Sequence, residues 1–192
     1  MHQLRNNFLP SIILLVPIIW ISWSIYEKTF DEKHAGENAY HAANKFFSDG
    51  LYEEALKAYH QALSENSQFI HAQRGVARSL MQLGHNDEAL KAFNKIIALE
   101  PNFATSYANR GILLDRMQAY PAAIADYEKA MQLDPELAEG PGFLTSFLRN
   151  QVEKPATIVD RLHYLQAELK KPEKLQVLHM QEKDDAQLSY KR

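Results

Sequence analysis

Residues 104–137 read ATSYANRGILLDRMQAYPAAIADYEKAMQLDPEL, and several positions of this stretch recur upstream at a fixed interval of 34 residues. The recurring positions are small, aromatic or proline: Ala55, Ala89 and Ala123; Tyr59, Phe93 and Tyr127; Gly50 and Gly84; Pro101 and Pro135. A period of 34 residues is typical of a helix–turn–helix unit that stacks on copies of itself. Such stacks present a curved surface to a partner, so the period predicts binding rather than catalysis.

The period divides the middle of the chain into three repeats, which we place at about 36–70, 71–103 and 104–137. Each repeat is expected to hold a helix A followed by a helix B. Small residues at one phase of each helix allow the pair to approach closely: Ala43, Ala77 and Gly111 in helix A, and the alanines above in helix B. The recurring aromatic side chain fills the gap towards the next helix A, and the prolines end helix B.

This pattern resembles the tetratricopeptide repeat family over residues 36–137. Repeat three carries the family's residues most fully, at Tyr107, Gly111, Tyr120, Ala123, Tyr127, Ala130 and Pro135. Repeat one departs from the pattern at Ala39 and Ser67, and repeat two departs at Asn86. The resemblance implies an all-α superhelix over residues 38–137 whose concave wall, built from the A helices, binds an extended peptide or another protein.

The resemblance also implies which side chains face the partner. Carried over residue by residue, the predicted groove residues are Tyr40, His41, Asn44, Arg74, Arg78, Met81, Asn109, Ile112 and Arg116. Arg74 and Arg78 lie one helical turn apart, and guanidinium groups suit the carboxylates of an acidic or C-terminal peptide. The alternative interpretation is that these arginines form a solvated face or pair with Asp115.

The groove resembles the two-carboxylate clamp of chaperone-binding members only in part. Asn44 fits that clamp, whereas Ala108 and Ile112 stand where the clamp uses cations. The resemblance therefore does not predict a chaperone's acidic C-terminal tail as the partner.

The N-terminal region, residues 1–30, contains an uncharged window, FLPSIILLVPIIWISWSIY, over residues 8–26. As a helix it would be about 30 Å long, which matches the hydrocarbon core of a bilayer. Trp20, Trp23 and Tyr26 gather at one end, where aromatic rings favour the headgroup region. A cleaved signal peptide and a buried core helix are the alternatives. The first lacks small residues before the cut, and the second is rarely so long and apolar.

We therefore expect a single-pass membrane anchor followed by a charged linker at residues 31–37. The charges that flank the window nearly balance, and the short N-terminal tail favours a repeat domain outside the cytoplasm. This architecture is similar to anchored accessory factors of bacterial envelope biogenesis, which implies the inner membrane with the repeats in the periplasm. Such proteins bind or scaffold a partner near the membrane surface.

Composition and motifs argue against other functions. The net charge of −3 disfavours nucleic-acid binding, and the absence of cysteine excludes disulfides and thiolate sites. None of the eight histidines has a metal-ligand spacing, and no Gly-rich phosphate loop or GxSxG motif occurs. We expect no catalytic, cofactor or metal site and no small-molecule substrate. Anchored tetratricopeptide stalks also precede the catalytic domain of aspartyl/asparaginyl hydroxylases, but no such domain follows here.

The region after the repeats, residues 138–192, is predicted to be a helical cap with a polar C-terminal arm. Phe143, Leu144, Phe147 and Leu148 suggest one short amphipathic helix. A second helix begins after Pro155 and carries an apolar stripe at Ile158, Leu162, Leu165 and Leu169. The exposed end of a helical stack needs such a cover. The alternative is a docking arm, in which case the chain is a structural subunit of a larger membrane complex.

Overall fold

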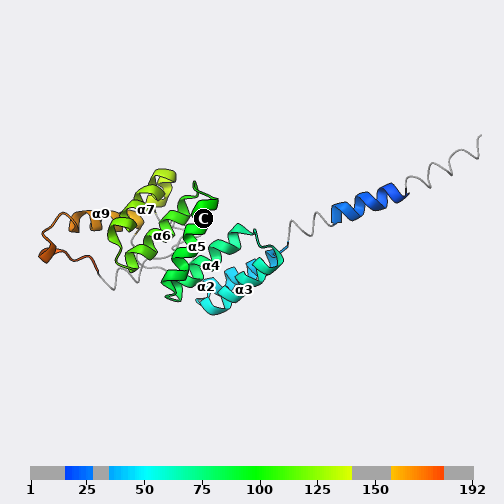
Figure 1. The fold of residues 1–192 in the computed structure, drawn as a ribbon, viewed down its shortest axis with the longest axis horizontal. Helices are drawn as coiled ribbons and strands as arrows, with labels where there is room; N and C mark the ends of the chain where they lie inside the picture. The colour runs from blue at the N-terminus through cyan, green and yellow to red at the C-terminus, as the bar shows by residue number, and fades with distance from the viewer. Residues whose placement is uncertain (1–15, 28–34, 140–156, 180–192) are drawn as a thin grey trace, which may run out of the picture.

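Three consecutive helix pairs form the body of the computed structural model, which describes residues 16–27, 35–139 and 157–179. The pairs are α2 (Glu37–Ser48) with α3 (Tyr52–Glu65), α4 (Ile70–Gln82) with α5 (Asn86–Leu99), and α6 (Ala104–Arg116) with α7 (Tyr120–Leu133). Each helix packs on its neighbours in the chain, so the stack advances in sequence order from α2 to α7 (Figure 1). The predicted all-α stack of helix–turn–helix units is confirmed.

Close packing within the pairs depends on the small residues that the period marks. Ala43, Ala55, Ala77, Ala89 and Ala123 have no exposed surface at all. At the equivalent position of α6, a Cβ atom on Gly111 would lie only 2.7 Å from the ring of Tyr127. Pro121 lies in the first turn of α7, where a missing N–H breaks no helical hydrogen bond.

The turns inside the three pairs share one backbone conformation. Gly50 and Gly84 have φ angles of 78° and 77°, and Gln118, one further period along, has 62°. In each case the next residue's N–H closes the turn on a carbonyl of the preceding helix, at 2.8–2.9 Å. The left-handed conformation suits glycine, so repeat three adopts at Gln118 a conformation that an L side chain disfavours.

The C-terminal region adds a single-turn 3-10 helix, η1 (Pro135–Glu139), then α9 (Ile158–Glu168) and η2 (Glu173–Leu175). A capping box between Thr157 and Asp160 begins α9. Ile158, Leu162 and Leu165 of the predicted stripe are buried, whereas Leu169 is exposed. Because α9 packs against α7, it covers the end of the stack as the cap interpretation requires. The predicted helix around Phe143 to Leu148 lies outside the described residues.

Residues 16–27 form a separate helix whose large apolar side chains, from Val16 to Tyr26, are more than half exposed. Part of the predicted membrane span, residues 8–15, falls outside the described residues. Of the helices that the structure describes, none is both long and apolar enough to cross a bilayer. The membrane anchor is therefore not supported by the fold and stays a prediction.

Candidate peptide-binding groove

A buried tyrosine connects the first two repeats beneath the predicted groove. Tyr59 of α3 is fully buried, and its ring fills the space beside Gly75 of α4, where a Cβ would lie 2.3 Å from the ring. Its hydroxyl donates a hydrogen bond to Asn44 Oδ1 at 2.8 Å and accepts one from Arg78 Nη2 at 3.5 Å. Burial raises the pKa of Tyr59 to about 12, so the hydroxyl stays protonated and keeps donating.

Arg78 is the cation of this layer, and the chain surrounds it with neutral groups. Its side chain is only 4% exposed, and its guanidinium carbon lies 4.6 Å from the centre of the Phe47 ring. Burial lowers the pKa of Arg78. Within residues 35–139 and 157–179 it forms no ion pair. A buried guanidinium without a carboxylate is unfavourable by several kcal/mol, so the site is suited to accept an anion.

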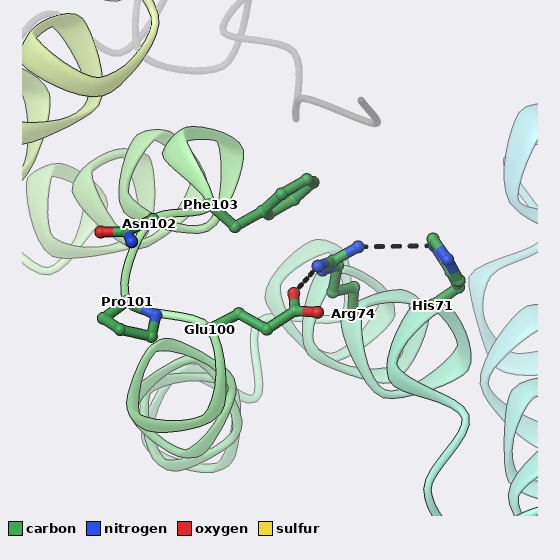
Figure 2. A pocket seen from close by; sticks show the side chains of 6 residues that line it. All are labelled: His71, Arg74, Glu100, Pro101, Asn102 and Phe103. Atoms are coloured by element: carbon green, nitrogen blue, oxygen red, sulfur yellow. Dashed lines mark hydrogen bonds and ion pairs between the residues drawn. The ribbon is translucent and has the colours of Figure 1, made fainter.

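Arg74, one turn before Arg78, is already engaged. It forms an ion pair with Glu100, and its guanidinium carbon lies 3.5 Å from the centre of the Phe103 ring. Its Nη1 lies 3.4 Å from His71 Nδ1. Figure 2 shows Arg74 between His71 and Glu100 on the wall of an open pocket of about 490 Å³. Six residues line it: His71, Arg74, Glu100, Pro101, Asn102 and Phe103. Sequence reasoning missed Glu100 and Phe103.

An aromatic cluster borders the two arginines at the junction of repeats one and two. The Tyr40 ring centre lies 5.0 Å from that of Phe69, 6.0 Å from Tyr59 and 6.1 Å from His71. The exposed His41 ring lies 5.6 Å from Tyr40. Partial desolvation first, and the nearby Arg74 charge second, lower the pKa of His71, so it stays neutral at pH 7. This cluster offers an apolar surface beside the guanidinium groups.

The remaining predicted groove residues lie deeper. Met81, Asn109 and Ile112 are at most 3% exposed, and Arg116 is half-buried. The structure therefore brings together Tyr40, His41, Asn44, Arg74 and Arg78 near one junction and places Met81, Asn109 and Ile112 in the interior of the stack. Whether the deeper residues contact a partner stays a prediction.

A second buried arginine closes the far end of the A-helix layer. Arg161 of α9 donates from Nε and Nη2 to both oxygens of Asp115 at 2.7 and 2.8 Å. Tyr127 of α7 also donates to Asp115, at 3.2 Å. The alternative in which Asp115 neutralises Arg74 or Arg78 is thus wrong, because both of its oxygens serve Arg161 and Arg74 pairs with Glu100.

Family models described as tetratricopeptide repeat match residues 46–109 and 104–137. Residues 46–137 are tetratricopeptide repeats. In this tetratricopeptide repeat domain the A helices α2, α4 and α6 supply Asn44, Arg78 and Asp115, as the resemblance implied. Among the residues that the structure describes, no cluster of three or more His, Asp or Glu side chains could hold a metal ion.

Curated relatives include two kinds of co-chaperone. The chain is 31% identical to Hsp70-Hsp90 organizing protein 3 of Arabidopsis thaliana over 96 residues, which cover 50% of this chain and 17% of that protein. It is 30% identical to the DnaJ homolog subfamily C member 7 homolog of Dictyostelium discoideum over 103 residues, 50% of this chain and 19% of that protein. The chain thus spans about a fifth of the length of these relatives.

A solved structure shares the fold at lower identity. It is the first tetratricopeptide domain of Spaghetti (RPAP3) bound to the HSP90 peptide SRMEEVD, with a TM-score of 0.56 and 20% identity. The match covers 72% of this chain and 95% of that one. At this identity the likeness shows the fold alone.

Proposed function

We propose that the repeat domain is a non-catalytic protein-interaction module that binds an extended peptide of a partner and holds one of its carboxylates at Arg78. The single observation that carries this proposal is the burial of Arg78 without a carboxylate among the described residues. A ligand carboxylate would form charge-assisted, bidentate hydrogen bonds with the guanidinium. Those bonds would compensate the cost of keeping the charge out of water.

Neighbouring groups would fix the rest of the peptide. The Oδ1 atom of Asn44 accepts the Tyr59 hydrogen bond, which leaves the amide NH₂ group to donate to a peptide carbonyl. The rings of Tyr40, Phe69 and His71 offer apolar contact to a side chain that follows the bound carboxylate. Arg74, held by Glu100, contributes less because it would have to exchange one carboxylate for another.

The relatives support a peptide ligand with an acidic end. Organizing proteins for Hsp70 and Hsp90 and a domain bound to an HSP90 peptide are both similar to this chain. However, Ala108 and Ile112 are fully buried and neutral, so repeat three supplies no second cation from these positions. We propose one strong carboxylate contact at Arg78 rather than a two-carboxylate clamp.

A binding titration of the full chain tests this function. The probe is fluorescein-labelled SRMEEVD, the peptide named for the solved relative, and the readout is fluorescence anisotropy. Arg78→Gln should weaken binding at least about tenfold, since truncating a charged anchor at an interface typically costs 2 kcal/mol or more. Equal affinities for the parent and the Arg78→Gln chain, or no detectable binding to the parent, would contradict the proposal.

Two control variants locate the effect. Arg74→Gln should weaken binding less than Arg78→Gln, because Arg74 already has Glu100. Leu175→Ser combined with Val177→Ser changes an exposed apolar patch after α9, where Leu175 is 65% and Val177 53% exposed. Loss of partner binding in this double variant alone would favour the alternative, a structural subunit that docks through its C-terminal segment.

We also propose that the N-terminal window anchors the module in a membrane, with the repeats on the periplasmic side of a bacterial inner membrane. The support is the uncharged sequence from Phe8 to Tyr26 and the exposure of every large apolar side chain in the helix over residues 16–27. The protein should resist alkaline carbonate extraction. Release into the soluble fraction would refute the anchor, and a C-terminal reporter active only in the cytoplasm would reverse the orientation.

A further inference from the structure

The chain after η2 is held along α9 in the way that a receptor holds an extended peptide. We call residues 176–178 the strap. Glu168 accepts a hydrogen bond from the Val177 N–H at 2.9 Å, and the Tyr164 hydroxyl donates to the Val177 carbonyl. Arg161 Nη2 donates to the Leu178 carbonyl at 2.8 Å. Three side chains of one helix thus fix the backbone of the strap.

The strap ends beside the A-helix layer. Arg161, which holds the Leu178 carbonyl, also forms the buried ion pair with Asp115 of α6. Leu178 itself packs against the core. The residues that follow the strap therefore start next to α6, one A helix away from Arg78 on α4.

We infer that residues 180–192 enter the groove in cis and place the carboxylate of Asp184 or Asp185 on Arg78. This inference rests on the proposed function, because it supplies from the chain itself the anion that the site is proposed to take. Neighbouring helix axes lie about 8–10 Å apart, and the six residues from Leu178 to Asp184 span roughly 20 Å when extended. The tail is therefore long enough to pass from α6 to α4.

Charge complementarity favours this occupant. Residues 180–192 read MQEKDDAQLSYKR, with adjacent carboxylates at Asp184 and Asp185. Arg78 has no carboxylate among the described residues, whereas the two other buried arginines of the layer, Arg74 and Arg161, have Glu100 and Asp115. A tethered ligand competes at an effective concentration in the millimolar range, so a partner peptide must displace it. The tail would thus set a threshold for partner binding.

The test compares full-length chains with labelled SRMEEVD as the probe. Asp184→Asn combined with Asp185→Asn should tighten probe binding about tenfold or more, because it removes a competitor present at high effective concentration. The matched control, Gln187→Ala with Ser189→Ala, changes the same tail without changing its charge and should bind as the parent does. Adding Arg78→Gln to the Asn double variant should abolish the gain.

The outcomes separate this inference from the proposed function. Equal binding by the parent and the Asn double variant, with Arg78 still required, overturns occupancy in cis and leaves the proposed function standing. Binding that is absent, or independent of Arg78, overturns both. A photo-cross-linking residue at position 188 adds a readout without a probe. We expect a cross-link to α4 within one chain, lost in the Asn double variant; a cross-link only between chains overturns the cis arrangement.

Discussion

Two buried arginines stand at opposite ends of the A-helix layer in nearly the same surroundings. Arg78 meets the hydroxyl of Tyr59, which donates to Asn44, and Arg161 meets Asp115, to which the hydroxyl of Tyr127 donates. Each set takes a tyrosine from a B helix, a polar side chain from the A helix of the same pair and a guanidinium from a later helix. The difference is one atom group, an amide at position 44 and a carboxylate at position 115.

That difference separates a structural contact from a receptive one. At Asp115 the charges are balanced within the chain, so the ion pair attaches α9 to the stack. At Asn44 the charge on Arg78 is not balanced by any described residue, so the site can gain from an external anion. The same packing arrangement therefore serves as a joint in one place and as a ligand site in the other.

The largest expected effect comes from removing the carboxylate of the structural pair. Asp115→Leu leaves Arg161 buried without a counter-charge and should lower the free energy of unfolding by about 3–5 kcal/mol. Arg78→Met removes a buried cation that has no carboxylate, and should change stability by less than about 1 kcal/mol. Urea denaturation of both variants checks this. Similar losses in the two would show that the arginines are not in different electrostatic states.

The next effect concerns the packing that aims the Tyr59 hydroxyl. Gly75→Ala places a Cβ about where the Tyr59 ring now lies, so the ring must shift. We expect a loss of about 1–3 kcal/mol from overpacking, with weaker peptide binding because Asn44 and Arg78 lose their shared partner. Lys91→Ala, on the exposed side of α5, is the control and should stay within about 0.5 kcal/mol. A Gly75→Ala chain as stable as this control would mean the contact is misplaced.

Asn44→Asp should convert the receptive site into the structural kind. The new carboxylate would accept the Tyr59 hydrogen bond and face Arg78, which should raise the free energy of unfolding by about 1 kcal/mol at pH 7. Because Arg78 would hold the pKa of this carboxyl below its unfolded value, the gain is present above about pH 4 and is lost as the pH falls further. Thermal melts at pH 7 and pH 3 check this. Acidic peptide binding should weaken in parallel; a variant that still binds as well as the parent sinks the comparison.

The smallest effect contrasts the turn of repeat three with those of repeats one and two. Gln118→Gly should stabilise the chain by about 0.5–1 kcal/mol, since the backbone there has the left-handed conformation of Gly50 and Gly84. Gly84→Ala should have the opposite sign. Melting temperatures of both variants give the measurement, and a destabilised Gln118→Gly chain would refute the strain at this turn.

The helical part of the fold was predictable because it depends on local spacing. The period of 34 residues located the close alanine contacts and the aromatic positions, and the structure confirms them at Ala55, Ala89 and Tyr127. The membrane anchor depends on a window that the described residues cover only in part, so it stays a proposal. The apolar stripe of α9 likewise predicted a helix but not its position against α7.

The electrostatics of the groove were harder to predict, because ion pairs join residues that no repeat phase relates. Arg161 lies 46 residues from Asp115, beyond the last repeat, and Glu100 precedes the turn into repeat three. One signal was present in the sequence. The B-helix aromatic is tyrosine in repeats one and three but phenylalanine at position 93. A buried tyrosine needs a partner for its hydroxyl, so Tyr59 and Tyr127 indicated polar side chains on the facing A helices.

The central claim is that Arg78 binds a carboxylate of the partner, and a double-mutant cycle between protein and peptide measures that contact. The full chain and its Arg78→Gln variant are each titrated with SRMEEVD and with an analogue in which both glutamates are glutamine, the aspartate is asparagine and the C-terminus is an amide. We predict that neutralising the peptide weakens binding to the parent at least about tenfold, a coupling of roughly 1.4 kcal/mol, and changes binding to Arg78→Gln less than about twofold. Equal losses in the two chains would give no coupling and contradict the claim.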